Sequence, residues 1–233
     1  MNALQRMHEV KSLLRWGGLA GVLGGVLFIL VFVVVIVFVG ADLSVEAEEL
    51  VKRFPDIRAA RTVENGLYLV VLILWVAHFL ALYQALRETS RAPALFGSVI
   101  GIVGLVVLAA GALPHVATAP ISDLYHAAGA TPEDQATLVL MWRATEGIFD
   151  ALLFAGLAIL PFGLIFLGVA MLGSPAFGRI FGRISVGLGA IGVVAATIVL
   201  IDPRSPLAAI GVFALIVFNL ILGWKVYTLS RAT

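Results

Sequence analysis

Six long stretches with almost no charged residue dominate this sequence. A helix that crosses a bilayer needs about 20 mostly apolar residues. Lipid offers the backbone no hydrogen-bond partner, so the backbone groups must bond to one another, as they do in a helix. The stretches cover residues 17–40, 64–86, 95–113, 150–172, 184–201 and 207–227. The loops between them are short, which favours antiparallel neighbours in one bundle. The chain is therefore predicted to be an all-α, polytopic membrane protein, a six-transmembrane-helix bundle forming a single domain over residues 1–233.

The composition excludes most soluble classes of protein. Of 233 residues, 61% are hydrophobic and 12% are charged, whereas a soluble domain has about 45–50% apolar and about 25% charged residues. The formal net charge is only +1, so no basic field directs the chain to nucleic acid. There is no cysteine, which excludes disulfides, thiolate metal sites and iron–sulfur clusters. Membrane lipids are the first partners to expect.

The distribution of charge predicts the orientation of the bundle. With the N-terminus in the cytoplasm, the inner segments hold nine Lys and Arg residues and two acids, whereas the outer segments hold six cations and twelve acids. Lys and Arg are retained on the cytoplasmic side of a membrane. We therefore expect a multi-pass protein of the bacterial cytoplasmic (inner) membrane with both termini in the cytoplasm (N-in, C-in).

The fourth helix is predicted to extend well beyond the bilayer. Residues 131–134 (Thr-Pro-Glu-Asp) combine a capping hydroxyl, a proline at the first helical position and acids at the positive helix end. A helix from Pro132 to Leu172 would be about 60 Å long, roughly twice the hydrocarbon thickness. Pro161 is predicted to bend it within the membrane.

A second outer element is expected between the first two spans. Residues 44–54 are predicted to form a short amphipathic helix, capped by Ser44, whose apolar side rests on the lipid interface. The second helix is then predicted to begin near Asp56, directly after Pro55.

Glycines recur at four-residue spacing on three helices. They are Gly17, Gly21 and Gly25, then Gly97 and Gly101, then Gly178 and Gly182. Small residues on one face let helix backbones approach closely in lipid. Packing inside this bundle is the favoured interpretation, and a homo-oligomer or a partner membrane subunit on these Gly-rich faces is the alternative.

Ionisable residues form one stripe on the second helix and one on the fourth. Their three- and four-residue steps place each stripe on one helical face, and such residues are costly within a membrane. The stripes comprise Arg61, Glu64 and Tyr68, and then Arg143, Glu146 and Asp150. They are interpreted either as interfacial ion pairs of small energy or as an outer vestibule that binds a ligand or lipid headgroup. A vestibule predicts a polar contact between the two stripes.

Four residues are candidates for a metal site. His115, His126, Glu146 and Asp150 carry the nitrogen and oxygen ligands that Zn²⁺ accepts, although no HExxH motif is present. They would support a metal-assisted hydrolase with an outer-face site.

His78 is the most deeply placed ionisable residue. It follows Glu64 by 14 residues and therefore lies about 21 Å deeper along the helix. Because lipid offers no partner, its imidazole is expected to bond internally to Asn219, to Ser98 or to a backbone carbonyl. The alternatives are axial ligation of a haem or a chlorophyll-type pigment, and a proton-relay or substrate-contact role. We expect the protein to bind no cofactor.

Four segments carry a resemblance to a known family. They are residues 15–21 (RWGGLAG), 80–87 (LALYQALR), the end of the fourth span from Pro161 to Leu172, and 222–225 (LGWK). The chain resembles a bacterial family of six-span integral membrane proteins of unknown function. The resemblance implies a six-helix membrane domain and supplies no catalytic residue.

The favoured function is therefore non-enzymatic. We expect binding of a lipid or hydrophobic small molecule, or a role as an accessory subunit of a membrane complex. The alternatives are the metal-assisted hydrolase and the pigment- or haem-carrying subunit described above.

Overall fold

Every regular element in the described part of the chain is a helix. The computed structural model describes residues 3–40, 46–202, 205 and 207–232. The elements are α1 (Ala3–Val34), the π-helical turn η1 (Val35–Val39), α2 (Ala47–Leu86), α3 (Arg91–Tyr125), α4 (Pro132–Leu172), α5 (Gly178–Ile201) and α6 (Leu207–Ala232).

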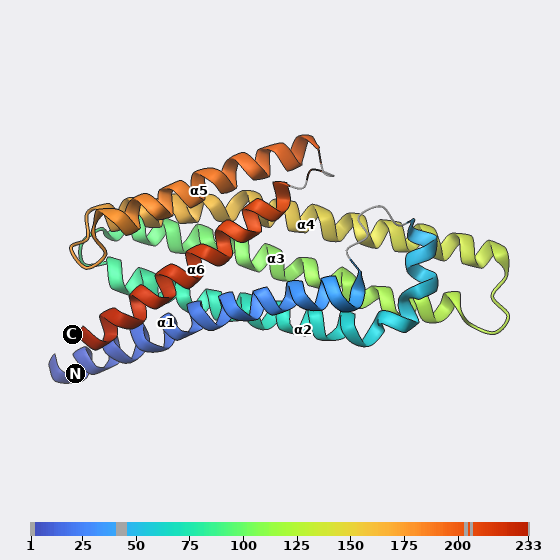
Figure 1. The fold of residues 1–233 in the computed structure, drawn as a ribbon, viewed down its shortest axis with the longest axis horizontal. Coiled ribbons are helices and arrows are strands. Elements are labelled where there is room, and N and C mark those ends of the chain that lie inside the picture. Colours follow the sequence, from blue (N-terminus) through green and yellow to red (C-terminus); the bar gives the residue numbers. More distant parts are fainter. Residues whose placement is uncertain (1–2, 41–45, 203–204, 206, 233) are drawn as a thin grey trace.

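The predicted all-α, six-helix membrane fold is confirmed. Within the described residues, six helices are long and apolar enough to cross a membrane. The chain enters α1 and leaves α6 at the same end of the bundle (Figure 1), which we call the terminal end, and the opposite end is called distal. The assignment of the terminal end to the cytoplasm stays a prediction.

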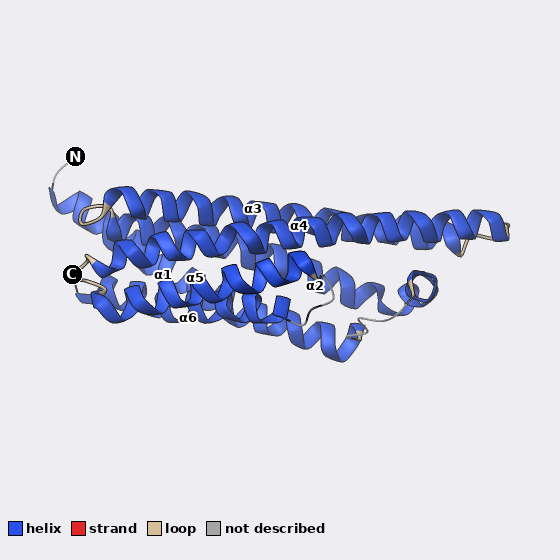
Figure 2. Ribbon diagram, turned by 90° about the horizontal axis from the view of Figure 1, so that it is seen from above, coloured by secondary structure: helices blue, strands red, loops and turns tan. Residues whose placement is uncertain are grey.

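The most extensive helix pair in the bundle is α3 with α4. α3 packs along α4, α4 also contacts α5, and α1 packs against both α2 and α6. Seen from above, α3 and α4 run side by side and extend past the other helices at the distal end (Figure 2).

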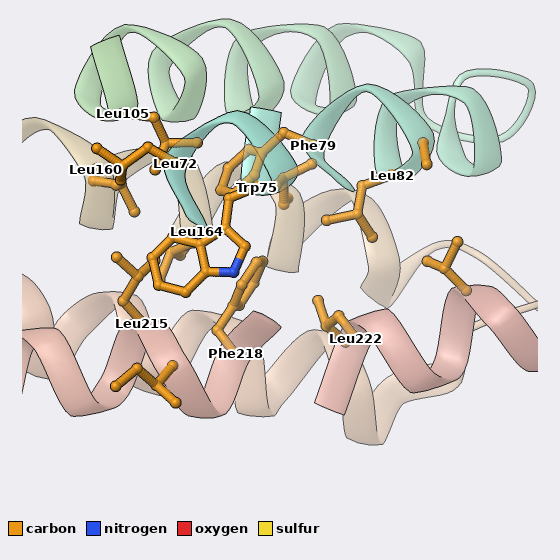
Figure 3. Close-up of a cluster of buried hydrophobic side chains, with 14 of the residues drawn as sticks. Leu72, Trp75, Phe79, Leu82, Leu105, Leu160, Leu164, Leu215, Phe218 and Leu222 are labelled. Carbon is orange, nitrogen blue, oxygen red and sulfur yellow. The ribbon is translucent and has the colours of Figure 1, made fainter. Parts of the chain in front are cut away.

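The main hydrophobic core draws its side chains from α1, α2, α3, α4 and α6. Trp75 and Phe79 of α2 and Phe218 of α6 are among the largest fully buried side chains. Leucines of α3 and α4 surround them (Figure 3).

Glycines of the predicted stripes allow close helix contacts inside this chain. A Cβ added to Gly17 would lie 2.2 Å from the Ala81 Cβ of α2, and one added to Gly97 would lie 2.7 Å from the Leu167 nitrogen of α4. The stripes on α1 and α3 are therefore covered by the chain's own helices. Gly178 differs, since it has open space around it and a φ of 72° at the start of α5. Association with a second copy or another subunit stays a prediction.

α4 occupies the range that its sequence predicts. The amide of Asp134 donates to Thr131 Oγ1 (3.2 Å) and the amide of Thr131 donates to an Asp134 carboxylate oxygen (3.0 Å). This reciprocal capping box satisfies two donors at the helix start. The helix continues through Pro161 to Leu172.

α3 corrects the predicted end of the third span. The sequence predicted residues 95–113 and a connection beyond them, but the helix continues through Pro114 and Pro120 to Tyr125. A proline removes one backbone hydrogen bond without forbidding the helix, and burial of Ile121 and Tyr125 against α4 offsets that loss.

α2 also begins earlier than predicted. It is helical from Ala47, with Pro55 inside it, so the segment predicted as a separate helix over residues 44–54 forms its first turns. These turns, in light blue, run across the direction of the rest of the helix (Figure 1). Ser44, the predicted cap, lies outside the described residues.

The distal ends of α2, α3 and α4 share a second hydrophobic core. It comprises Ala47, Val51, Phe54, Ile121, Tyr125, Leu138 and Trp142. About 20 residues cross the hydrocarbon, so the bilayer ends near residue 66 of α2 and residue 152 of α4 when counted from Leu86 and Leu172. We call the parts that lie farther out, residues 47–62, 115–125 and 132–146, the headpiece.

Candidate functional site

The stripe on α2 begins with a half-buried ion pair. Arg61 Nη1 lies 2.8 Å from Glu64 Oε2, and the two side chains are 28% and 13% exposed. One turn deeper, the Tyr68 hydroxyl donates to the Leu108 carbonyl of α3 over 3.4 Å. This stripe therefore faces α3.

Asn65 and His115 join α2 to α3 beside this pair. The His115 Nδ1 lies 3.2 Å from the Asn65 Oδ1, so the imidazole donates to the amide oxygen. The His115 ring stacks on Phe149 of α4, with ring centroids 4.0 Å apart and planes 20° apart. Sequence reasoning missed Asn65, although a polar residue directly after Glu64 at the start of an apolar stretch was the available signal.

The residues of the α4 stripe lie in two different environments. Arg143 Nη2 donates to Glu46 Oε2 over 2.9 Å, so its guanidinium turns toward the start of α2. Glu146 and Asp150 make no ion pair among the described residues, although the Asp150 charge acts on Glu146. Trp142 is buried beside Glu146, and its indole N–H lies outside hydrogen-bond geometry.

The predicted direct contact between the two stripes does not form among the described residues. Arg61 is held by Glu64 on its own helix and Arg143 is held by Glu46. The relation between the stripes is instead electrostatic, because the Arg61 charge acts on both Glu146 and His115. We call these residues the distal polar cluster. It comprises Arg61, Glu64, Asn65, His115, Glu146 and Asp150.

A further ion pair fixes the headpiece next to the cluster. Arg58 Nη2 lies 2.6 Å from Asp123 Oδ1 and donates to the Ala119 carbonyl at 3.3 Å. The guanidinium also lies over the Phe54 ring, 5.8 Å from its centroid. The three nearby arginines, Arg58, Arg61 and Arg143, are thus each paired with an acid other than Glu146 or Asp150.

The four metal candidates do not converge. Because α3 remains helical, His126 lies 11 residues beyond His115, about 16 Å along the axis, and its Nδ1 donates to the Ser122 carbonyl at 2.8 Å. His115, Glu146 and Asp150 stay at the distal polar cluster. Within the described ranges, no group of three or more His, Asp or Glu side chains could hold a metal ion.

His78 makes the internal bond that its depth requires. Its Nδ1 lies 3.0 Å from the Gly17 carbonyl oxygen of α1, and the side chain is fully buried. Of the three predicted partners, the backbone carbonyl is therefore the one used. Asn219 donates to the Leu215 carbonyl and Ser98 to the Phe79 carbonyl.

The headpiece carries a groove of about 440 Å³. Tyr125, Val139 and Leu140 give it apolar walls, and Glu48, Gln135 and Arg143 give it polar ones. This mixed lining suits an amphiphilic molecule or a side chain of another protein.

Comparison with known proteins identifies the family. A family model described as a domain of unknown function (DUF4386) matches residues 23–227. No curated protein and no solved structure matches the chain. The chain belongs to the DUF4386 family, and the family resemblance noted from its sequence is confirmed.

Proposed function

We propose that this DUF4386 member is a non-enzymatic protein of the bacterial cytoplasmic membrane, with both termini in the cytoplasm, that binds a lipid at the distal polar cluster. The lipid carries an amine in its headgroup. The distal end then faces the periplasm, and the cluster lies near the outer boundary of the bilayer.

The charge of the cluster supports this proposal. Glu146 and Asp150 share one face of α4 and lack an ion-pair partner among the described residues, whereas Arg61 and Arg143 are already paired. A carboxylate near low-dielectric lipid interacts with a cation more strongly than it does in water. An ammonium group supplied by a lipid would offset this negative charge.

The same face of α4 continues into apolar surroundings. Phe154 and Leu157 follow Asp150 at four and seven residues, which places them on its face. They line a narrow crevice with Gly192 and Ala195 of α5 and with Gly211 of α6. Ala195 also lines a wholly apolar groove of about 330 Å³ between α5 and α6. A headgroup at Asp150 would therefore have its acyl chain against these surfaces.

Native mass spectrometry of the purified chain tests the proposal. We expect the wild-type protein to retain phosphatidylethanolamine in preference to phosphatidylglycerol. The Glu146→Gln/Asp150→Asn double variant should lose about tenfold in retention, which corresponds to about 1.4 kcal/mol. Glu133→Gln, an exposed acid in the first turn of α4, is the matched control and should bind as wild type.

Two results would overturn the lipid site. One is equal retention of both lipids, and the other is a double variant that binds like the control. The same spectra test the accessory-subunit alternative, which the exposure of Leu124 and Leu140 on the headpiece favours. A second protein of defined mass bound at fixed stoichiometry would support it.

A further inference from the structure

Three buried polar atoms in the bundle core have no hydrogen-bond partner within the described chain. They are Trp75 Nε1 and His78 Nε2 of α2 and Asn219 Oδ1 of α6. Each of these side chains is 0% exposed. An unsatisfied polar group in such a place costs about 1–3 kcal/mol, so three together call for a shared explanation.

The chemistry of each side chain and the hydrogen bonds it already makes determine whether the unpaired atom donates or accepts. A carbonyl oxygen only accepts, so the contact of His78 Nδ1 with the Gly17 carbonyl (3.0 Å) puts the proton on Nδ1 and leaves Nε2 as an acceptor. The Asn219 amide nitrogen donates to the Leu215 carbonyl at 2.9 Å, which leaves Oδ1 as an acceptor. The Trp75 indole N–H is a donor. The set therefore contains one donor and two acceptors.

Close contacts with α1 place the two α2 side chains one turn apart on the face of α2 that meets α1. A Cβ added to Gly21 would lie 2.8 Å from the His78 ring, and one added to Gly24 would lie 2.6 Å from Trp75 Nε1. Trp75 and His78 are also three residues apart on one helix and share a face.

Contacts between α1 and α6 place Asn219 near the level of Trp75, about one turn from His78. The Cβ position of Gly21 lies 2.9 Å from the Gly223 Cα, and that of Gly25 lies 2.6 Å from the Leu220 side chain. Asn219 directly precedes Leu220 and lies about one turn before Gly223. Its helical neighbour Phe218 contacts Phe79 of α2, with ring centroids 5.9 Å apart and planes tilted by 36° (Figure 3).

We propose that Trp75, His78 and Asn219 form an intramembrane binding site for one water molecule. The water accepts from the Trp75 N–H and donates one proton each to His78 Nε2 and Asn219 Oδ1. Buried waters typically make about three hydrogen bonds to groups that otherwise lack partners.

Nitrogen NMR of the full chain in bicelles, labelled with ¹⁵N-histidine, tests this site. We expect a His78 imidazole protonated at Nδ1, with an Nε2 shift typical of a hydrogen-bonded acceptor and a cross-peak to bound water. The His78 signal is assigned by its loss in His78→Gln. If that variant does not insert, the signal is assigned as the one that remains in a chain whose other three histidines are replaced by glutamine.

Variants separate the water site from ordinary packing. Trp75→Phe and Asn219→Leu should each move the Nε2 shift or weaken the water cross-peak. Ser98→Ala removes a buried hydroxyl that is bonded to Phe79 instead and should leave the His78 signal unchanged. A proton on Nε2, a free Nε2 lone pair in the wild type, or a direct Trp75–His78 bond without water would each overturn the proposal. The wild-type spectrum decides these outcomes even if a variant does not fold.

Discussion

At the scale of single residues, the bundle depends on positions where no side chain fits. Gly163 of α4 is such a position, because an added Cβ would lie 2.7 Å from the Gly101 nitrogen and 2.8 Å from the Gly97 carbonyl oxygen of α3. Both neighbours are backbone atoms, so neither can move aside without displacing its helix. Gly147 of the same helix has no atom within 4 Å of its added Cβ.

These two glycines give a matched prediction. Gly163→Ala should lower the free energy of unfolding by about 1–3 kcal/mol, the usual cost of overpacking. Gly147→Ala should leave it unchanged or raise it by up to about 1 kcal/mol, because alanine favours the helix over glycine. Unfolding by denaturant in detergent micelles measures both. Equal effects at the two positions would show that the α3–α4 contact is looser than described.

Only some residues of the candidate site could be predicted from the sequence. The stripes on α2 and α4 follow from helical spacing, and the bond of His78 follows from its depth. Asn65 and Phe149 could not be assigned, since their roles depend on how α2 and α4 are rotated against His115 of α3. No pattern within one helix encodes that rotation.

At the scale of helices, the headpiece is a packing unit of its own. Its core includes a perpendicular contact between the rings of Phe54 and Trp142, with centroids 5.4 Å apart and planes 73° apart. Trp142 is buried there, whereas Trp224 near the terminal end is largely exposed.

Removing the Trp142 ring should therefore loosen the headpiece alone. Trp142→Ala is expected to cost about 3–5 kcal/mol of local stability. In hydrogen-exchange mass spectrometry, peptides from residues 115–125 and 132–142 should exchange faster, and those from 153–172 should not change. Trp224→Ala is the control and should leave both sets as in wild type. Faster exchange throughout the bundle would contradict a separately packed headpiece.

Element boundaries followed from the sequence where capping chemistry was explicit. Thr131 and Pro132 mark the start of α4 because a cap and a first-turn proline act locally. The third span was predicted to end at residue 113, yet contacts with α4 carry α3 through Pro114 and Pro120. Tertiary packing of this kind is not visible in a local pattern.

At the scale of the whole molecule, the charge asymmetry predicts which side each end faces. The chain has no cysteine, so single-cysteine variants report position without background. Thr137→Cys lies on the headpiece, and Ala176→Cys lies in the connection between α4 and α5 at the terminal end. Both positions are exposed.

With both termini in the cytoplasm, a membrane-impermeant maleimide should label Thr137→Cys on intact cells. It should label Ala176→Cys only after permeabilisation. The reverse pattern would invert the orientation, and labelling of both on intact cells would overturn the six-span arrangement.

The unbroken course of α4 has a mechanical consequence. One rod of 41 residues, about 60 Å long, begins in the headpiece and ends beside the first turns of α5. Rigid elements of this kind carry energetic coupling between distant places. The bilayer boundary near residue 152 divides this rod into two arms of about 30 Å each: the headpiece packs on the distal arm and α5 packs along the other.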